Sequence, residues 1–156
     1  MSQKLSVWNR LSLIVLVPLY IILFPIILLL YLALNIILHI LAWLIWNTRG
    51  INTLYVYSNS PKWQEYIEQN ILPHLPAKVI VLNWSKRKKW KLSLSTLAFR
   101  TFGGSQDFNP MGLVFTPFRF VKIFRFHQAF KDFKHGKCES LEKVEAEFFS
   151  KIGKNK

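Results

Sequence analysis

The chain has 156 residues, a formal net charge of +13 and a single cysteine, Cys138. One cysteine excludes an intrachain disulfide framework and dithiol chemistry. The histidines have none of the spacings typical of zinc sites, so we expect no metal site and no resident cofactor. A chain this basic usually faces something anionic, such as a lipid surface, a nucleic acid or a phosphorylated substrate.

The first part of the chain is apolar. A basic segment at residues 1–10 precedes an uncharged run at residues 11–46, which is much longer than the apolar core of a signal peptide. As a straight helix the run would be roughly 54 Å long, against about 30 Å of bilayer hydrocarbon. We therefore predict one membrane helix, bent at Pro18 and Pro25. The alternative is a re-entrant hairpin that turns at Asn35.

Aromatic and polar side chains mark the interior and the end of this helix. The spanning core is expected at residues 19–43, with Trp43 and Trp46 near one headgroup layer, where amphipathic rings are enriched. Asn35 and His39 share a helix face and predict contact with a partner helix or self-association. The alternative is that the headgroup layer hydrates His39.

The orientation in the membrane follows from charge and cysteine content. The cationic side chains that flank the helix are nearly balanced on its two sides, so they decide little. The single cysteine and the basic domain favour a reducing compartment. We therefore expect an integral protein of the bacterial inner membrane with its C-terminal domain in the cytoplasm.

A soluble domain at residues 53–152 is expected after a polar linker at 47–52, and a basic tail at 153–156 follows it. Runs of β-branched and aromatic residues predict strands, and apolar residues at helical spacing predict helices. The predicted strands lie at 53–57, 78–82, 111–116 and 121–126. The predicted helices begin at Ser60, at Ser85, at His127 and near Leu141, after a break at Gly136.

The predicted order is therefore βαβαββα. A strand–helix–strand unit implies a parallel pair of strands with a right-handed crossover, and the short turn between the last two strands implies an antiparallel hairpin. The predicted fold class is α/β: a transmembrane helix, then a small domain with a four-stranded mixed sheet and helices on both faces.

This order, with Pro110 just before the third strand, resembles the thioredoxin-like fold of the glutaredoxin and glutathione-transferase type. In that family a Cys-Pro-x-Cys or Ser-Pro-x-x motif follows the first strand and opens the first helix. Ser60 and Trp63 take the positions of the two cysteines here, and Asn109-Pro110 takes the place of the family's cis-proline. The resemblance covers residues 53 to 149 and implies that Pro110 follows a cis peptide bond and faces Ser60.

The chain departs from the family where the chemistry lies. Neither motif position is a cysteine, so the domain is redox-inactive. No acidic residue matches the one that glutathione-binding members carry at the start of the last helix. What remains is a helix N-terminus beside polar side chains, which can bind a carboxylate or phosphate; an ordinary helix cap is the alternative. The candidate anion-binding residues are Ser58, Asn59, Ser60, Pro61, Trp63 and Pro110.

A dense basic cluster follows the second predicted strand. Cations at a helix N-terminus oppose the helix dipole, so we expect an anionic partner to compensate them. The domain is tethered near a bilayer, and tryptophan suits the headgroup zone. A solvated surface is the alternative, and nucleic acid is disfavoured because no recognised binding motif accompanies the charge. The candidate lipid-surface residues are Trp84, Lys86, Arg87, Lys88, Lys89, Trp90 and Lys91.

Two functions follow from these observations. The first is a membrane-anchored, non-catalytic binding module whose basic face meets anionic lipid headgroups. The alternative is a small membrane-bound enzyme, transferase-like or glutathione-transferase-like, that acts on an anionic substrate. No catalytic residue is assigned, because Glu65 is an ordinary residue of a predicted helix and His127 has no recognisable partner in the sequence. A pocket that joins Ser60, Pro110 and a titratable side chain would favour the enzyme, and a filled site would favour the module.

Overall fold

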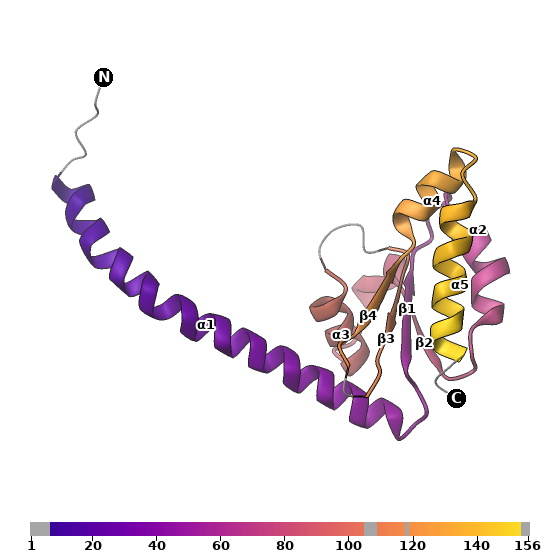
Figure 1. Ribbon diagram of the computed structural model, residues 1–156, viewed down its shortest axis with the longest axis horizontal. Coiled ribbons are helices and arrows are strands. Elements are labelled where there is room, and N and C mark those ends of the chain that lie inside the picture. The colour runs from indigo at the N-terminus through magenta and orange to yellow at the C-terminus, as the bar shows by residue number, and fades with distance from the viewer. Residues whose placement is uncertain (1–6, 105–108, 118, 154–156) are drawn as a thin grey trace. The chain divides into compact units, whose positions relative to one another are not determined.

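The computed structural model describes residues 7–104, 109–117 and 119–153, with side chains described from residue 16 onwards. The chain divides after Ile37 into two compact units. Helix α1, Val7–Asn47, contributes to both units, because its last turns belong to the second one (Figure 1).

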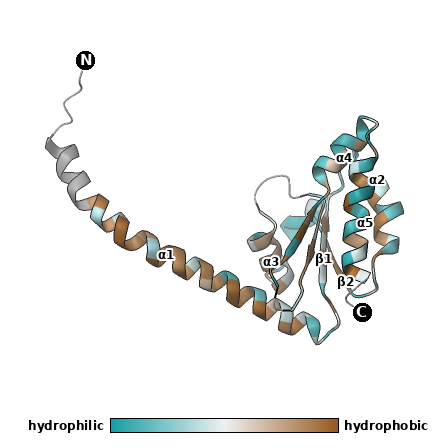
Figure 2. Ribbon diagram, in the orientation of Figure 1, coloured by the Kyte–Doolittle hydropathy of each residue, from teal (hydrophilic) through white to brown (hydrophobic). Residues whose placement is uncertain are grey.

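Helix α1 is a single uninterrupted helix that contains Pro18 and Pro25. From Leu16 onwards most residues of α1 are hydrophobic (Figure 2), and their large side chains are mostly exposed. The stretch Leu16–Asn47 contains an 18-residue window with a mean hydropathy of 2.9 and is long and apolar enough to cross a membrane, a criterion that a signal sequence also meets. The alternative of a re-entrant hairpin is wrong, because Asn35 lies within the helix and its side-chain amide donates to the carbonyl of Tyr31 (2.7 Å).

The second unit is built on a mixed sheet of four strands, in the order β2-β1-β3-β4. The strands are β1 Thr53–Tyr57, β2 Val79–Asn83, β3 Met111–Val114 and β4 Lys122–Arg125. Strands β1 and β2 are parallel, whereas β3 is antiparallel to both β1 and β4. The prediction of an α/β domain with a four-stranded mixed sheet is confirmed.

Each face of the sheet has its own covering layer (Figure 1). One core contains Tyr55, Val114 and Phe124 and is covered by a group of helical segments that we call the α5 layer. The α5 layer comprises α2 Gln64–Tyr66, the π-helical turn η1 Ile67–Ile71, the 3₁₀ turn η2 Leu72–His74, α4 His127–Lys134 and α5 Glu139–Gly153. The other core contains Leu54, Val56, Met111 and Leu113. It is closed by the α3 layer, which comprises residues 38–47 of α1, the 3₁₀ segment η3 Trp84–Lys89 and α3 Leu94–Phe102.

The end of α1 is an integral part of this second core. Ala42 is fully buried, and Trp46 is 3% exposed and packs edge-on against Phe115 at 4.9 Å. The Trp46 ring is therefore covered by protein and is not the exposed aromatic side chain that was expected near a headgroup layer. The compact unit accordingly begins at Leu38, well before the predicted linker.

The predicted linker is itself a tight turn. The N–H of Ile51 donates to the carbonyl of Trp46 (2.8 Å), and the N–H of Gly50 donates to that of Asn47 (2.9 Å). Gly50 has a φ of +67°, the left-handed conformation that commonly ends helices. The domain is thus joined to α1 by an ordered helix cap.

Two predicted helices differ from those observed. The chain after Ser60 forms a turn and then the short segments α2, η1 and η2, and Pro73, which has no N–H to donate, lies within η2. Ile67 and Ile71 are buried, as their spacing predicted. The second helix begins at Leu94 and not at Ser85: Ser93 caps it through a reciprocal pair of bonds with Thr96. The cationic run therefore lies before the helix, which spares it the repulsion of the helix dipole.

Candidate functional site

The carboxyl ends of β1 and β2 meet at one edge of the sheet, because the two strands are parallel. There the N–H of Asn59 donates to the hydroxyl of Ser85 (3.0 Å), and the Asn83 side-chain amide donates to Asn59 Oδ1 (2.6 Å). The predicted anion-binding loop and the predicted basic cluster are therefore neighbours. Asn83 and Ser85 were not predicted as the link, although the predicted parallel pair already placed these two strand ends together.

The polar groups of this loop are engaged in closing it. The Trp63 indole N–H donates to the Ser58 hydroxyl (3.3 Å), which is 8% exposed. The backbone N–H of Lys62 donates to the Ser60 hydroxyl (3.4 Å), and that of Gln64 donates to the Ser60 carbonyl (2.9 Å). Ser60 is not the N-cap of α2, which is Trp63. Its bonds close the turn before the helix and use the N–H groups that an anion would need.

Pro110 lies at the same edge of the sheet. It is buried and follows a cis peptide bond, as predicted. The register pairs Met111 of β3 with Val56 of β1, so Pro110 is placed opposite the point where β1 ends. The carbonyl of Pro110 accepts from the N–H of Phe126 (3.0 Å).

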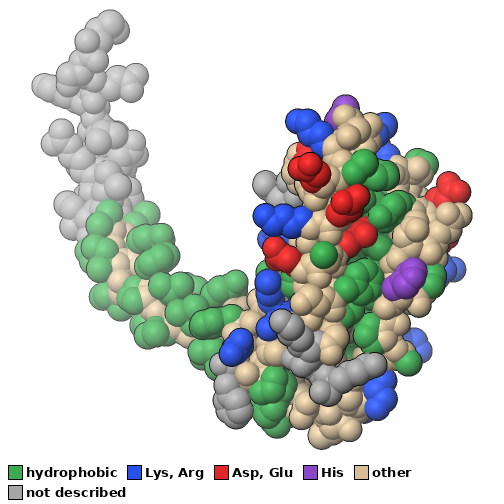
Figure 3. Space-filling model, turned by 45° about the vertical axis from the view of Figure 1, so that its right-hand side comes forward, with side chains coloured by type: hydrophobic (Ala, Val, Ile, Leu, Met, Phe, Trp, Pro, Cys, Tyr) green, Lys and Arg blue, Asp and Glu red, His purple; other side chains and the backbone are tan. Residues whose placement is uncertain are grey.

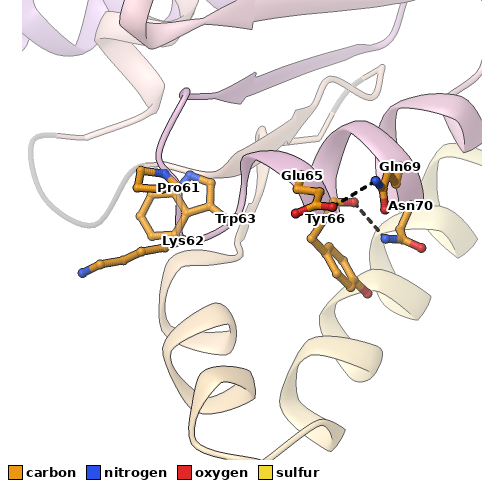
Figure 4. A pocket seen from close by; sticks show the side chains of 7 residues that line it. All are labelled: Pro61, Lys62, Trp63, Glu65, Tyr66, Gln69 and Asn70. Atoms are coloured by element: carbon orange, nitrogen blue, oxygen red, sulfur yellow. Dashed lines mark hydrogen bonds between the residues drawn. The ribbon is translucent and has the colours of Figure 1, made fainter.

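A shallow pocket of about 260 Å³ adjoins the loop. Its lining residues are Pro61, Lys62, Trp63, Glu65, Tyr66, Gln69 and Asn70 (Figure 4). Gln69 donates to Glu65 (3.3 Å), and Asn70 donates to the carbonyl of Tyr66 (3.1 Å). Neither Ser60 nor Pro110 lines this pocket, so it does not form the arrangement that would favour an enzyme.

The basic cluster occupies η3 and the residues that follow it. Lys86, Arg87, Lys88, Lys89 and Lys91 are all exposed. The Arg87 guanidinium also lies 4.8 Å from the centre of the Trp84 ring. The five cations therefore form a solvent-facing basic segment at the end of β2.

The two tryptophans of the cluster serve the core. Trp84 and Trp90 pack edge-to-face at 5.7 Å, and both rings contact Phe99, at 5.5 and 5.8 Å. The exposed apolar side chain of this region is instead Leu92, at 78%. Sequence analysis missed it, although a leucine outside the helical spacing and directly after Lys91 was a visible signal.

Charge is segregated between the two layers. The α3 layer and the chain between η3 and α3 contain the five cations of the basic segment and Arg100, and no acidic residue. The acidic residues that the structure describes all lie in the α5 layer: Glu65, Glu68, Asp132, Glu139, Glu142, Glu145 and Glu147. Figure 3 shows the side of the α5 layer, where acidic and basic side chains are interspersed.

A polar cluster lies within the α5-layer core. Tyr66 donates to Glu145 Oε2 (3.2 Å), while the buried Tyr55 hydroxyl and Glu145 Oε1 have no hydrogen-bond partner among the residues that the structure describes. Burial raises the pKa of Glu145 above its usual value, and the nearby Glu142 raises it further. Burial, together with the bond to Glu145, raises the pKa of Tyr66 to about 12.

The two polar residues predicted for helix contacts have separate environments. The Asn35 amide bonds back to its own helix. His39 is half-buried in the second unit, with its ring 5.9 Å from Phe115 and 6.2 Å from Phe102. His39 thus serves as a packing residue between α1, α3 and the end of β3.

No protein-family model, curated protein or solved structure matches this chain.

Proposed function

We propose that this protein is a membrane-anchored, non-catalytic binding module whose basic segment rests on anionic lipid headgroups. The observation that carries the proposal is the segregation of charge: exposed cations without acids in the α3 layer, and the described acids in the α5 layer. If surface charge were distributed at random, acidic and basic residues would be mixed on both layers, as they are on the α5 layer.

The anchor in this proposal is α1. The helix from Leu16 to Ile37 is about 32 Å long at a rise of about 1.5 Å per residue, close to the roughly 30 Å of a bilayer core. The turns from Leu38 onwards pack on the sheet and belong to the domain, so in this proposal they lie outside the hydrocarbon core. The domain then lies in the cytoplasm, where the single exposed cysteine, Cys138, stays reduced.

The domain itself is proposed to be thioredoxin-like and redox-inactive. The βαβαββα order and the proline directly before β3 support the resemblance. A lone cysteine in the turn between α4 and α5, away from the Ser60 loop in sequence, does not supply a dithiol.

Electrostatics would hold the domain on the lipid. Each cation near an anionic leaflet is worth about 1 kcal/mol, so Lys86, Arg87, Lys88 and Lys89 together supply at most about 4 kcal/mol. Salt screens this attraction over about 8–10 Å. Docking should therefore depend on lipid charge and on ionic strength.

The test uses the full chain reconstituted in bilayers that contain spin-labelled phosphatidylserine or spin-labelled phosphatidylcholine. The fraction of lipid immobilised by the protein is read from the spectra. We expect selectivity for the anionic lipid that weakens with salt and is lost when Lys86, Arg87, Lys88 and Lys89 are changed to Gln.

The matched control removes the same number of charges from the other side of the domain, with Lys131, Lys134, Lys137 and Lys143 changed to Gln. This variant should keep the lipid selectivity. Equal selectivity in the wild type and both variants would overturn the proposal, and circular dichroism shows that all three remain folded.

A further inference from the structure

We propose that the outward side of the α3 layer penetrates the interfacial zone of the bilayer, with apolar side chains inserted among the cations. This inference rests on the proposed function and adds to it: it assigns the face that meets the membrane and a second, non-electrostatic contact with acyl chains.

The end of α1 has two apolar stripes on opposite sides. His39, Ala42, Trp43 and Trp46 recur at helical spacing and face the sheet, buried or half-buried. Ile40, Leu41, Leu44 and Ile45 lie on the other side and are 41–47% exposed. The domain therefore covers one stripe and leaves the other uncovered.

A stripe of four large aliphatic side chains is costly to leave in water, at roughly 25 cal/mol per Å² of apolar surface. In sequence the stripe directly continues the apolar run of α1. Lipid is the occupant that this continuity favours, because a bilayer that receives the preceding residues lies next to the stripe. Lipid also suits the cations on the same layer.

Leu92 is another exposed apolar side chain on the α3 layer. It is 78% exposed, with Lys91 before it and the cations of η3 close by in the chain. Ser93 begins α3 directly after it through the cap with Thr96, so the Leu92 backbone is held at an ordered helix start. An exposed leucine beside exposed lysines is the arrangement by which interfacial proteins bury apolar groups below the headgroups while cations stay at the phosphate level.

The layer on the other side of the sheet also has an exposed ring beside lysines, Phe133 at 39%, but there acidic residues are interspersed with the cations. Every α-helix of that layer contains at least one acidic residue, and carboxylates are repelled by an anionic leaflet. The Cys138 side chain lies in the connection between α4 and α5 and is exposed, so it reports on this side.

The experiment places one nitroxide at a time in the full chain, in nanodiscs of phosphatidylcholine with or without phosphatidylserine. The test label is attached to Leu92→Cys in a Cys138→Ser background, and the control label to the native Cys138. Accessibility to a water-soluble nickel complex and to oxygen gives the depth of each label. In anionic discs we expect nickel accessibility at position 92 to fall several-fold relative to detergent micelles, and that at Cys138 to stay unchanged.

The outcomes separate this inference from the proposed function. A label at position 92 that remains as open to nickel as Cys138 overturns insertion, even where the spin-labelled lipid selectivity persists. Shielding of position 92 in both types of disc supports insertion and counts against dependence on anionic headgroups. A second label, at Leu44→Cys in the same background, tests the stripe: spin–spin broadening there would show that a second copy of the chain covers it, and would overturn the assignment to lipid.

Discussion

The two layers of the domain use similar side chains to close their cores but differ in what they present to the surroundings. The α5 layer packs Phe148 and Phe130 inward and carries mixed charge outward. The α3 layer packs Trp46 and Phe99 inward and presents cations and aliphatic side chains outward. Similar cores are therefore compatible with different outer surfaces, and in the proposed function only the α3 layer meets the membrane.

The largest effect is expected where α1 enters the domain. Trp46→Ala removes a ring that is 3% exposed and in contact with Phe115, which should lower the free energy of unfolding by about 3–5 kcal/mol. Urea unfolding of the full chain in detergent micelles measures this. Leu44→Ala, on the outward stripe of the same helix, should change the unfolding free energy little. A Trp46→Ala loss no larger than that of Leu44→Ala would mean that α1 is not part of the domain.

The same packing affects any shortened chain that begins near Asn47. Because Ala42 and Trp46 complete the second core, a domain without them leaves the Phe115 region uncovered. The sequence could not predict which side of the end of α1 packs on the domain core. Nearly every residue of the run is apolar, so the hydrophobic pattern that identifies a buried helix face is weak, and the structure is needed to separate the protein-facing stripe from the outward one.

The opposite layer has a comparable weak point at Gly112 in β3. A Cβ there would meet the Phe148 ring, which is fully buried against Tyr55, Phe124 and Phe126. Gly112→Ala should therefore destabilise the domain by about 1–3 kcal/mol. Gly153→Ala is the matched control, since nothing lies within 4 Å of its added Cβ.

The overpacking can be verified with a second substitution. Phe148→Leu frees space beside position 112, so the double variant should be less destabilised than the sum of the two single variants. Strict additivity would show that the ring and the glycine do not interact.

The cap of α3 should contribute less. Ser93→Ala removes the side chain that accepts from Thr96 N–H and should cost about 1 kcal/mol. Ser150→Ala, on the exposed side of α5, serves as the control and should be close to neutral. Thermal unfolding followed by circular dichroism would measure both, and a neutral Ser93→Ala would place the start of α3 elsewhere.

The sequence contained the information for most of the fold but not for this helix start. Strand positions followed from β-branched and aromatic runs, and the buried Ile67 and Ile71 from helical spacing. Two serines, Ser85 and Ser93, were both acceptable caps by residue type. The choice depends on Asn83, whose side chain accepts from Ser85 N–H and ends the strand with a 3₁₀ segment, a local preference that spacing does not reveal.

The candidate site could be predicted only in part, because residue spacing does not reveal its side-chain hydrogen bonds either. Residue types placed Ser58 and Asn59 correctly in the loop after the first strand. They placed the basic segment after the second strand, but at the start of a helix and not in the 3₁₀ segment that the structure has. Their internal hydrogen bonds, such as that from Trp63 to Ser58, depend on side-chain direction and appear only in the folded loop.

The smallest effect is a difference in pH dependence between wild type and Glu145→Gln. Because burial raises the pKa of Glu145 in the folded state, its contribution to stability is fully present below the unfolded pKa of about 4.5 and is lost as pH rises through the folded value. The wild type should therefore lose stability relative to Glu145→Gln as pH rises from 4 towards neutrality. Parallel urea midpoints for the two proteins across this range would contradict the prediction.

The contrast between the layers can be tested most directly by measuring the reactivity of the lysines of both layers side by side in each lipid. Full-length protein in phosphatidylserine-containing nanodiscs and in phosphatidylcholine nanodiscs is acetylated briefly with a water-soluble ester, and each lysine is quantified by mass spectrometry. The account predicts that Lys86, Lys88, Lys89 and Lys91 react several-fold more slowly in the anionic discs, while Lys131, Lys134, Lys137 and Lys143 react equally in both. Equal reactivity of the two sets in both lipids would contradict it.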